Sequence, residues 1–433
     1  MRILLVTNGF PPSAYGGVEI YTADLARELR ARGHRLLVAC RESNPVLADG
    51  TALQDSGGPY PVHRIVNDFK QARGLADTLL NPVVEAWFER LLDEFQPQLV
   101  HFQHLIALSA GLPELVRRRG LPYVISLHDY WPLCDRVQLV NWRGQACPGP
   151  LHDVDCPACI AGGPPVHRLY IRLRGLLRGE RQGSLRAPAA ASIRRRNQLL
   201  QGVLLGAQRI LAGSVSVREQ YRRNGCPADA ITVIPLGLPL PKPLPARRAP
   251  RRPLQLGFIG SLIHIKGAHL LLKALQQTPN LPVQLTLYGR LDIPPLSYPR
   301  YLQRLAAHDP RVRFAGPFQP EQRAAVYDSL DLLVIPSLAP ETFSFAAREA
   351  LVYRKPVLAA RIGALPEVVL PGQNGFLFEP GDVPGLAALI ERLAADPGLL
   401  EPLQLPGPLP LLTTAQHAER VEDVYRQALA AAG

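Results

Sequence analysis

Short apolar runs alternate with longer amphipathic stretches along the chain, and this alternation limits the possible folds more than any other feature. In the first half, the runs have the length and composition of buried strands, and helical periodicity separates most of them. These runs are Ile3 to Val6, Leu36 to Ala39, Val62 to Val66, Leu99 to Phe102, Tyr123 to Leu127, Ile210 to Ala212 and Ile231 to Ile234. Strands that alternate with helices predict an α/β fold with a parallel sheet.

A proline-rich stretch from Pro239 to Pro253 interrupts the alternation. Proline removes a backbone donor and fixes φ, so this stretch continues neither a helix nor a strand. Strands are predicted again at Leu256 to Ile259, Val283 to Tyr288, Val312 to Phe314, Leu332 to Ile335 and Val357 to Ala359. We therefore predict two doubly wound, Rossmann-like domains, residues 1–240 and 241–409. With 433 residues and 47% hydrophobic content, the chain can fill two cores.

Composition indicates the compartment. Six cysteines are too few for a disulfide-stapled secreted module, and the apolar run after Arg2 is too short for a signal peptide. No run approaches the roughly 18 apolar residues of a spanning helix. The net charge is +12, but arginines are used heavily along the whole chain and only five basic residues are lysines. We therefore expect a cytoplasmic protein with no nucleic-acid partner.

One local cluster of charge stands out from this background. Between His167 and Arg196 there are nine arginines and a single acid, Glu180. Such a segment fits an anionic lipid surface, where each basic residue contributes on the order of 1 kcal/mol. It fits a solvated helix face equally well. The sequence thus leaves open a peripheral position on the inner face of a membrane.

In the first half, two motifs follow strands, which is where open α/β sheets bind ligands. Gly16 and Gly17 stand directly before a predicted helix, where free amides and the helix dipole favour an anion. A tight turn without a ligand uses the same residues. His128 follows the strand that ends at Leu127, and its imidazole suits contact with a sugar or phosphate, or with a loop carbonyl.

The second half has two further motifs. Gly260 and Ser261 follow a strand, and Lys266 lies at a predicted helix start, where a cation opposes the dipole unless a ligand anion is present. Glu341 precedes another helix and Glu349 lies inside it, at most ~12 Å away along the axis. That length matches the span from a ribose to a diphosphate-linked sugar. The amides of the residues between them, Phe343, Ser344 and Phe345, are candidates to face phosphate.

In this order and spacing, the motifs resemble the retaining glycosyltransferases of family 4, which have the GT-B fold. The resemblance covers nearly the whole chain. It rests on Gly16-Gly17-Val18-Glu19, His128, Gly260 through Gly267, Glu341 with Glu349, Lys355-Pro-Val through Gly363, Pro366-Glu367, Asn374-Gly-Phe-Leu and Pro380-Gly-Asp382. The resemblance implies two Rossmann-like domains that hold a nucleotide sugar in a cleft, and a C-terminal helix, within residues 410–433, that crosses back onto the first domain.

The resemblance also implies roles for individual residues. Gly16 and Gly17 would contact the donor phosphate, and His128 would lie near the transferred sugar. Lys266 would neutralise the diphosphate, Glu341 would hold sugar hydroxyls and Glu349 would hold the ribose. The remaining donor-binding positions are Gly260, Ser261, Phe343, Ser344 and Phe345. No metal or other cofactor would be required for catalysis, and the sequence has no D-x-D motif near a strand end.

The chain departs from the family pattern at three positions. Ser261 stands where an arginine often follows the glycine, and Arg290 and Arg348 are candidates to compensate for its loss. Ser344 and Ala364 stand where glycines are frequent. These departures leave the identity of the donor open.

Four cysteines, Cys134, Cys147, Cys156 and Cys159, lie within 26 residues after His128, and the last two form a C-x2-C pair. Only one close pair is present, so the pattern leaves open reduced thiols, a structural zinc and, against a reducing cytosol, a disulfide. Cys40 and Cys226 are predicted to be small core residues.

The predicted function is transfer of a sugar from a nucleotide sugar to a glycan or lipid-linked glycan, in the synthesis of a cell-surface polysaccharide or glycolipid. Two alternatives remain at this point: a sugar-phosphate epimerase or phosphorylase on the same fold, and a non-enzymatic protein that binds anionic surfaces.

Overall fold

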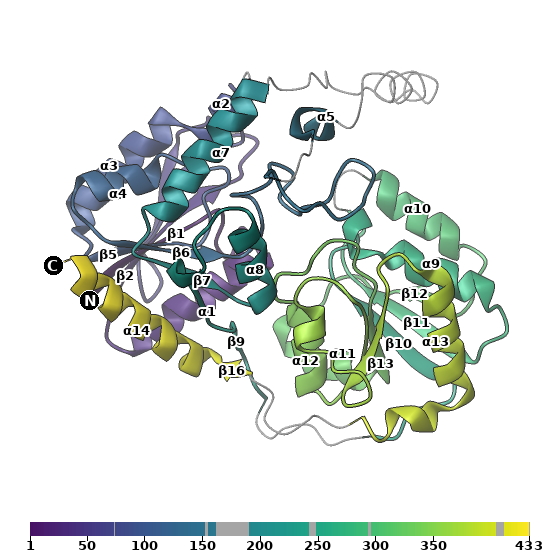
Figure 1. Ribbon diagram of the computed structural model, residues 1–433. Helices are drawn as coiled ribbons and strands as arrows, with labels where there is room; N and C mark the ends of the chain where they lie inside the picture. The colour runs from purple at the N-terminus through teal and green to yellow at the C-terminus, as the bar shows by residue number, and fades with distance from the viewer. Residues whose placement is uncertain are drawn as a thin grey trace. The chain divides into compact units, whose positions relative to one another are not determined.

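The chain forms two compact units in the computed structural model, which describes residues 1–72, 74–151, 155–161, 190–241, 248–292, 296–403 and 411–432 (Figure 1). Unit 1 comprises Met1–Arg143, Cys147–Gly237 and Leu412–Gly433, and unit 2 comprises Gly144–Ala146 and Leu238–Leu411. Most of the arginine-rich segment between His167 and Arg196 lies outside the described residues.

Unit 1 is built on an eight-stranded sheet with the order β3-β4-β2-β1-β5-β6-β7-β8. Its strands are β1 (Arg2–Thr7), β2 (Arg35–Glu42), β3 (Ala52–Asp55), β4 (Val62–Val66), β5 (Leu99–Phe102), β6 (Tyr123–Leu127), β7 (Arg209–Ala212) and β8 (Ile231–Val233). Only β3 pairs antiparallel, at the edge. Its helices are α1 (Gly17–Ala31), α2 (Leu75–Leu79), α3 (Pro82–Phe95), α4 (Leu112–Arg118), α5 (Cys156–Ile160), α7 (Ala190–Leu205), α8 (Val215–Arg223), the 3-10 turn η1 (Ala228–Ala230) and α14 (Thr414–Ala432).

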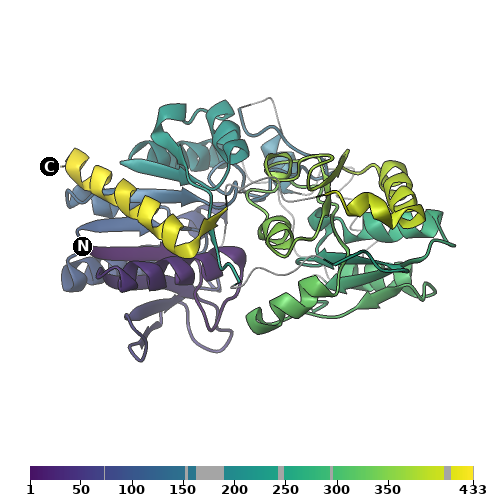
Figure 2. The same cartoon turned by 90° about the horizontal axis from the view of Figure 1, so that it is seen from below.

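Apolar spacing decides which face of each helix meets this sheet. In α3, residues Val84, Trp87, Phe88 and Leu91 follow the spacing of one helical face, and all are buried in a core shared with α4 and α7. Asn81 caps α3 by accepting hydrogen bonds from the backbone N–H groups of its first turn. α14 packs beside α1, although almost the whole chain separates them (Figure 2).

Unit 2 has a six-stranded sheet with the order β12-β11-β10-β13-β14-β15. The strands are β10 (Leu254–Ile259), β11 (Val283–Tyr288), β12 (Val312–Phe314), β13 (Leu332–Ile335), β14 (Val357–Ala360) and β15 (Gly375–Phe378), and every pairing is parallel. The helices are α9 (Ala268–Gln277), α10 (Ser297–Ala306), α11 (Arg323–Asp328), α12 (Phe345–Val352) and α13 (Val383–Ala395), with 3-10 turns η2 (His264–Lys266), η3 (Pro320–Gln322), η4 (Leu365–Glu367) and η5 (Pro397–Leu400). A short ribbon of β9 (Gly237–Leu238) and β16 (Leu412–Thr413) completes the strands of the described residues.

Counted along the chain, the strands of unit 2 have the spatial order 3-2-1-4-5-6, which is that of a Rossmann fold. The order reverses between β10 and β13, and ligands bind beyond the carboxyl ends of strands at such a switch point. Along β13, Leu332 and Val334 join the core under α9 and α13, whereas Leu333 and Ile335 join the core under α11 and α12. Helices therefore cover both faces, as a parallel sheet requires.

The predicted α/β class with two Rossmann-like sheets is confirmed, and every predicted strand is present. Their ends agree to within two residues, except that β2 continues three residues beyond Ala39, to Glu42. Four strands were not predicted: β3, β9, β15 and β16. All four residues of β3 are exposed, so it has no apolar run to signal it, and β15 begins with a glycine. Of the helices in the described residues, none combines the length and apolar content needed to cross a bilayer.

Candidate active site

The loops after β10 and β13 bring a lysine and a glutamate together at the switch point of unit 2. Lys266 Nζ donates a hydrogen bond to Glu341 Oε1 at 2.8 Å, and Ser337 Oγ donates to the same oxygen at 2.6 Å. The lysine side chain is 34% exposed and the glutamate side chain 9%. The ammonium group of Lys266 therefore remains accessible to a ligand, while the hydroxyl of Ser337 helps to hold the buried carboxylate of Glu341 in place.

Backbone contacts fix these two loops against each other. The N–H of Leu338 donates to the carbonyl of Ile265 at 2.8 Å. At Gly267, which has a φ of 74°, a β-carbon would stand 1.8 Å from the carbonyl oxygen of Pro336. Only glycine allows this approach, because any side chain would push the two loops apart. The geometry of the Lys266–Glu341 pair thus depends on Gly267, a residue without a side chain.

A second glycine seats Glu341 itself. Gly363 has a φ of 58°, and a β-carbon there would lie 2.3 Å from the backbone nitrogen of Glu341. The next residue, Ala364, donates its N–H to the Glu341 carbonyl at 2.7 Å. The loop after β14 therefore packs against the backbone of Glu341 and helps to fix its position. Ala364 has a helical φ of −79°, so this position has no conformational need for a second glycine.

The position of Lys266 differs in detail from the sequence argument. Lys266 ends the 3-10 turn η2, and α9 begins only at Ala268. From the sequence, a ligand anion was expected to balance the charge of Lys266. In the structure, the carboxylate of Glu341 provides that negative charge. A diphosphate that binds here would therefore compete with Glu341 for the ammonium group.

Residues at the start of α12 follow Glu341. Ser344 caps the helix with a φ of 59°, in the left-handed region that favours glycine, which agrees with the frequent glycine at this position in the resemblance. The ring of Phe343 is buried and packs edge-on against Phe345, with ring centroids 5.0 Å apart. Directly after strand β10, Gly260 donates its N–H to the carbonyl of Tyr288, and Ser261 is exposed in the loop.

Glu349 has partners of its own on α11. Its Oε2 accepts a hydrogen bond from the hydroxyl of Tyr327 at 2.9 Å, and its Oε1 lies 3.3 Å from Arg323 Nε. Burial raises the pKa of Glu349, and this effect outweighs the lowering by Arg323 and Tyr327. Glu349 is thus held in a different cluster from the Lys266–Glu341 pair, within the same unit.

The two arginines considered as substitutes for the missing arginine at position 261 lie in very different surroundings. Arg290 is well exposed and forms a bidentate ion pair with Asp292. Arg348 is buried, with its guanidinium carbon 3.7 Å from the centre of the Phe343 ring. Its Nη1 atom has no hydrogen-bond partner among the described residues, and burial lowers its pKa to about 10.

In unit 1, Gly16 is the N-cap of α1 and Gly17 is its first residue. Asn8 Nδ2 donates to Glu19 Oε1 at 3.2 Å, and this bond folds the loop after β1 back onto the start of the helix. A β-carbon at Gly16 would stand 2.3 Å from Glu19 Oε2. A side chain at position 16 would therefore require the Glu19 carboxylate to move.

His128 lies at the end of β6 in a buried polar chain. Its Nε2 donates to Gln103 Oε1 at 2.9 Å, and Gln103 Nε2 lies 3.0 Å from His101 Nδ1. His101 in turn lies 2.6 Å from the hydroxyl of Tyr425 on α14. Burial, followed by the nearby His104, lowers the pKa of His128 to about 3, so its imidazole is neutral at physiological pH.

Sequence reasoning missed Gln103, His101 and Tyr425. Gln103 had a usable signal, because it is the first residue after β5 and so follows a strand like the residues that were selected. Tyr425 had none: 324 residues separate it from His101, and only the packing of α14 against the sheet joins them.

Two Rossmann-like units in one chain are the architecture of the GT-B glycosyltransferases. Solved structures of that class align over nearly the whole chain. Sucrose-phosphate synthase from Thermosynechococcus elongatus has a TM-score of 0.71 at 21% identity, with 99% of both chains covered. Anabaena Alr3699/HepE, in complex with UDP and glucose, has a TM-score of 0.64 at 19% identity, with 98% of this chain and 99% of that chain covered. At such identities these alignments show the fold alone.

Sequence families give the more specific assignment. The family model for Glycosyltransferase Family 4 matches residues 15–241, and the model for Glycosyl transferases group 1 matches residues 253–396. The first model alone covers more than half of the chain. The chain belongs to Glycosyltransferase Family 4, and the predicted family is confirmed.

Curated relatives match over shorter stretches. The D-inositol 3-phosphate glycosyltransferase of Corynebacterium urealyticum is 34% identical over 161 residues, which are 35% of this chain and 38% of that protein. The protein of the same name from Streptomyces bingchenggensis is 29% identical over 295 residues, which are 61% of this chain and 62% of that protein. The chain thus spans between about two fifths and three fifths of the length of these two relatives.

Proposed function

We propose that this protein transfers a sugar from a nucleoside diphosphate sugar to a hydroxyl group of a glycan or lipid-linked glycan, with retention of anomeric configuration. The observation that carries the proposal is the Lys266–Glu341 pair, 2.8 Å apart, at the switch point between β10 and β13. Family membership supports it. So do the solved structures of similar fold, whose titles name UDP, UDP-glucose and ADP as ligands.

Unit 2 would bind the donor. Departure of the nucleotide leaves negative charge on the diphosphate, and a fixed cation at that point stabilises the transition state. Lys266 is that cation. Glu341 then turns to the hydroxyls of the sugar, and Glu349 holds the ribose. Gly260, Ser261 and the backbone of Phe343, Ser344 and Phe345 surround the phosphates.

Unit 1 would supply the acceptor side and the remaining donor contacts. The amides of Gly16 and Gly17 face a donor phosphate. His128 is neutral, so it hydrogen-bonds a sugar hydroxyl and does not act as a fixed cation. The acceptor oxygen attacks the anomeric carbon from the side that the phosphate leaves, and the departing phosphate oxygen takes the acceptor's proton. The bond from the anomeric carbon to phosphate breaks as the new glycosidic bond forms, without a metal ion.

The proposed setting is the cytoplasmic face of a membrane, in the synthesis of a cell-surface polysaccharide or glycolipid. The net charge of +12 and the arginines between His167 and Arg196 support contact with anionic lipid. Vesicles containing anionic lipid should co-sediment with the protein in low salt. A variant in which these arginines are replaced by glutamate should stay in solution, and equal binding by both proteins contradicts the membrane part of the proposal.

A donor panel tests the central claim. Purified protein is heated with UDP, GDP and ADP sugars, because a ligand at 100 times its dissociation constant adds about 2.7 kcal/mol to the free energy of unfolding. The donor that stabilises the protein is then offered with glycan, lipid-linked and cyclitol phosphate acceptors. The last class is included because the curated relatives are named for D-inositol 3-phosphate. NMR of the product gives the anomeric configuration.

The matched variants are Lys266→Met and Lys273→Met, two lysines of the same unit. Lys266→Met should lose transfer activity and donor-induced stabilisation, whereas Lys273→Met on α9 should retain both. If no nucleotide sugar stabilises the protein and none is consumed, the proposed function is wrong.

A further inference from the structure

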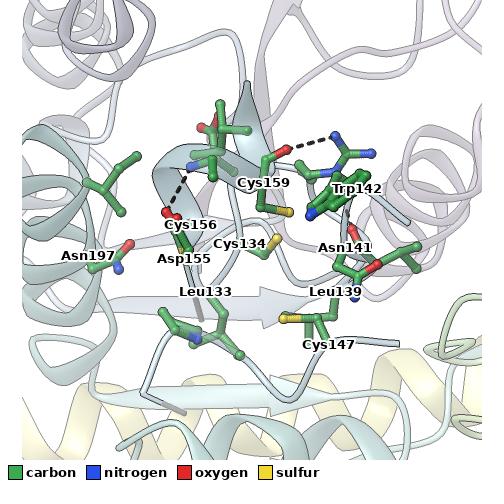
Figure 3. Close-up of a pocket in the computed structure, with 18 of the residues that line it drawn as sticks. Leu133, Cys134, Leu139, Asn141, Trp142, Cys147, Asp155, Cys156, Cys159 and Asn197 are labelled. Atoms are coloured by element: carbon green, nitrogen blue, oxygen red, sulfur yellow. Dashed lines mark hydrogen bonds between the residues drawn. The ribbon is translucent and has the colours of Figure 1, made fainter. Parts of the chain in front are cut away.

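Four thiols that play no part in the proposed transfer line one cavity in unit 1. The cavity has a volume of about 500 Å³ and is lined largely by the loop that follows His128. Cys134, Cys147, Cys156 and Cys159 all contribute to its wall (Figure 3). All four are reduced, and they come from three separate segments of the chain. Convergence of four cysteines on one cavity is unusual in a chain with only six.

Backbone hydrogen bonds hold the three segments together. The N–H of Cys147 donates to the carbonyl of Leu139 at 2.8 Å, which ties the second cysteine to the turn that begins at Cys134. Arg136, in that turn, donates from Nη1 to the carbonyl of Cys159 at 3.4 Å (Figure 3). The convergence of the thiols is therefore built by the fold of the loop.

The C-x2-C pair lies on the five-residue helix α5. Asp155 caps this helix by accepting the N–H of Ala158 at 2.9 Å, so Cys156 and Cys159 are presented one turn apart. Side chains three residues apart on a helix lie on one face. Both thiols can therefore reach the same point.

The electrostatic surroundings suit thiolates that are neutralised by a cation. A zinc ion with four thiolates has a net charge of −2, and Arg136, Arg143 and Arg196 line the same cavity.

We propose that Cys134, Cys147, Cys156 and Cys159 are the four ligands of a structural zinc ion. Structural zinc sites are tetrahedral with four cysteine or histidine ligands, four cysteines being one common set, and a C-x2-C pair commonly supplies two of them. Within the described residues, no three metal-ligating side chains already surround a single point closely enough to hold a metal ion. Binding must therefore draw the thiols inward and close part of the cavity.

Closure would order the loop that carries His128. The segment from Asp129 to Ala161 has α5 as its one helix among the described residues, so it depends on side-chain packing for its shape. Tyr130 donates its N–H to Val137, and Arg196 on α7 pairs with Asp135 at 3.3 Å. A metal between these segments acts as a cross-link and adds to the stability of unit 1.

Zinc content of the untagged wild-type protein is the first test. After purification without chelator, elemental analysis should find one zinc ion per chain. Cobalt added to the zinc-free protein should give the visible absorption bands of a tetrahedral cobalt thiolate. A zinc content near zero combined with no cobalt spectrum overturns the proposal, whether thiol titration then finds six free cysteines or a disulfide.

Variants assign the ligands. Cys156→Ser with Cys159→Ser should abolish both zinc binding and the cobalt spectrum. Cys226→Ser removes a buried cysteine outside the cluster and should leave both unchanged. If the double variant does not fold, the zinc and cobalt measurements on the wild-type protein still decide whether it holds a zinc ion. These readouts do not use sugar transfer, so the zinc site and the proposed function can fail independently.

Discussion

Glu341 and Glu349 have different partners, and this difference predicts different kinetic effects. Glu341 contacts Lys266 and is proposed to hold the transferred sugar, so Glu341→Gln should lower kcat by about 10²–10³-fold without weakening nucleotide binding. Glu349 belongs with Arg323 and Tyr327, and Glu349→Gln should mainly weaken nucleotide binding. Steady-state kinetics together with calorimetry of binding of the nucleotide that the donor panel identifies separates the two effects.

The matched control is Glu379→Gln. Glu379 forms an exposed ion pair with Arg361 in the same unit, and such pairs contribute little. This variant should match the wild type in kcat and in nucleotide affinity. Equal losses of kcat and affinity in both test variants would contradict the separate roles assigned to Glu341 and Glu349.

Arg348 presents a buried charge whose Nη1 has no hydrogen-bond partner in the described part of the chain. Removing a charge from water lowers the free energy of unfolding of the protein. When a buried ion pair is replaced by apolar residues of similar shape, this free energy commonly stays the same or rises by about 1–4 kcal/mol. Arg348→Met keeps contact with Phe343 and should raise or preserve the melting temperature. Arg348→Ala loses that packing and should lower it. A large loss of stability in Arg348→Met would show that the guanidinium makes a stabilising interaction besides its contact with Phe343.

At the scale of elements, β5, β6 and α14 bury three histidines in their neutral form. Burial lowers the pKa of His101 well below its usual range, that of His128 to about 3 and that of His417 to about 4. In the unfolded chain each would titrate near 6.5. Below that pH the unfolded state binds protons that the folded state does not, so stability falls as the pH falls. The slope is about 1.4 kcal/mol per pH unit for each histidine.

Thermal unfolding followed from pH 7 to pH 4.5 should therefore show a falling melting temperature that begins near pH 6.5. His417→Gln should flatten this dependence. His308→Gln, which replaces an exposed histidine of unit 2, should leave it unchanged. A melting temperature that is constant over this range would contradict the burial of neutral histidines.

The strands and loops of both sheets show how much of the fold and of the site could be predicted from the sequence alone. Parallel strands were predictable because burial on both faces gives continuous apolar runs, as in β6 and β13. The exposed edge strand β3 lacks this signal. Lys266 and Glu341 were found because each follows a strand. Their direct ion pair was not predicted, because it depends on two loops that meet through Gly267.

Tertiary packing also explains the rest of what sequence analysis missed. The chain from His128 through Gln103 to Tyr425 joins β6, β5 and α14, and no local pattern links these elements. Likewise the cysteine spacing left several states open, and only the fold of the loop shows that all four thiols line one cavity.

At the scale of the whole molecule, each unit has its own hydrophobic core. The core of unit 1 gathers residues from α3, α4 and α7 around its sheet, whereas the cores of unit 2 lie on the two faces of the second sheet. In the proposals above, zinc would bind in unit 1 alone, whereas the donor would bind mainly to unit 2, through Lys266, Glu341 and Glu349. A ligand stabilises the part of the protein that must be folded to bind it.

Calorimetry of the full chain should therefore resolve two unfolding transitions that respond to different additions. A saturating nucleotide sugar should raise mainly the transition of unit 2, by about 2.7 kcal/mol at 100 times its dissociation constant. Removal of zinc with a chelator should lower the transition of unit 1, because the loss of a metal cross-link acts on the loop around Cys134. Hydrogen exchange assigns each transition to its unit. One transition that moves as a whole with either addition would show that the two cores unfold as a single cooperative body.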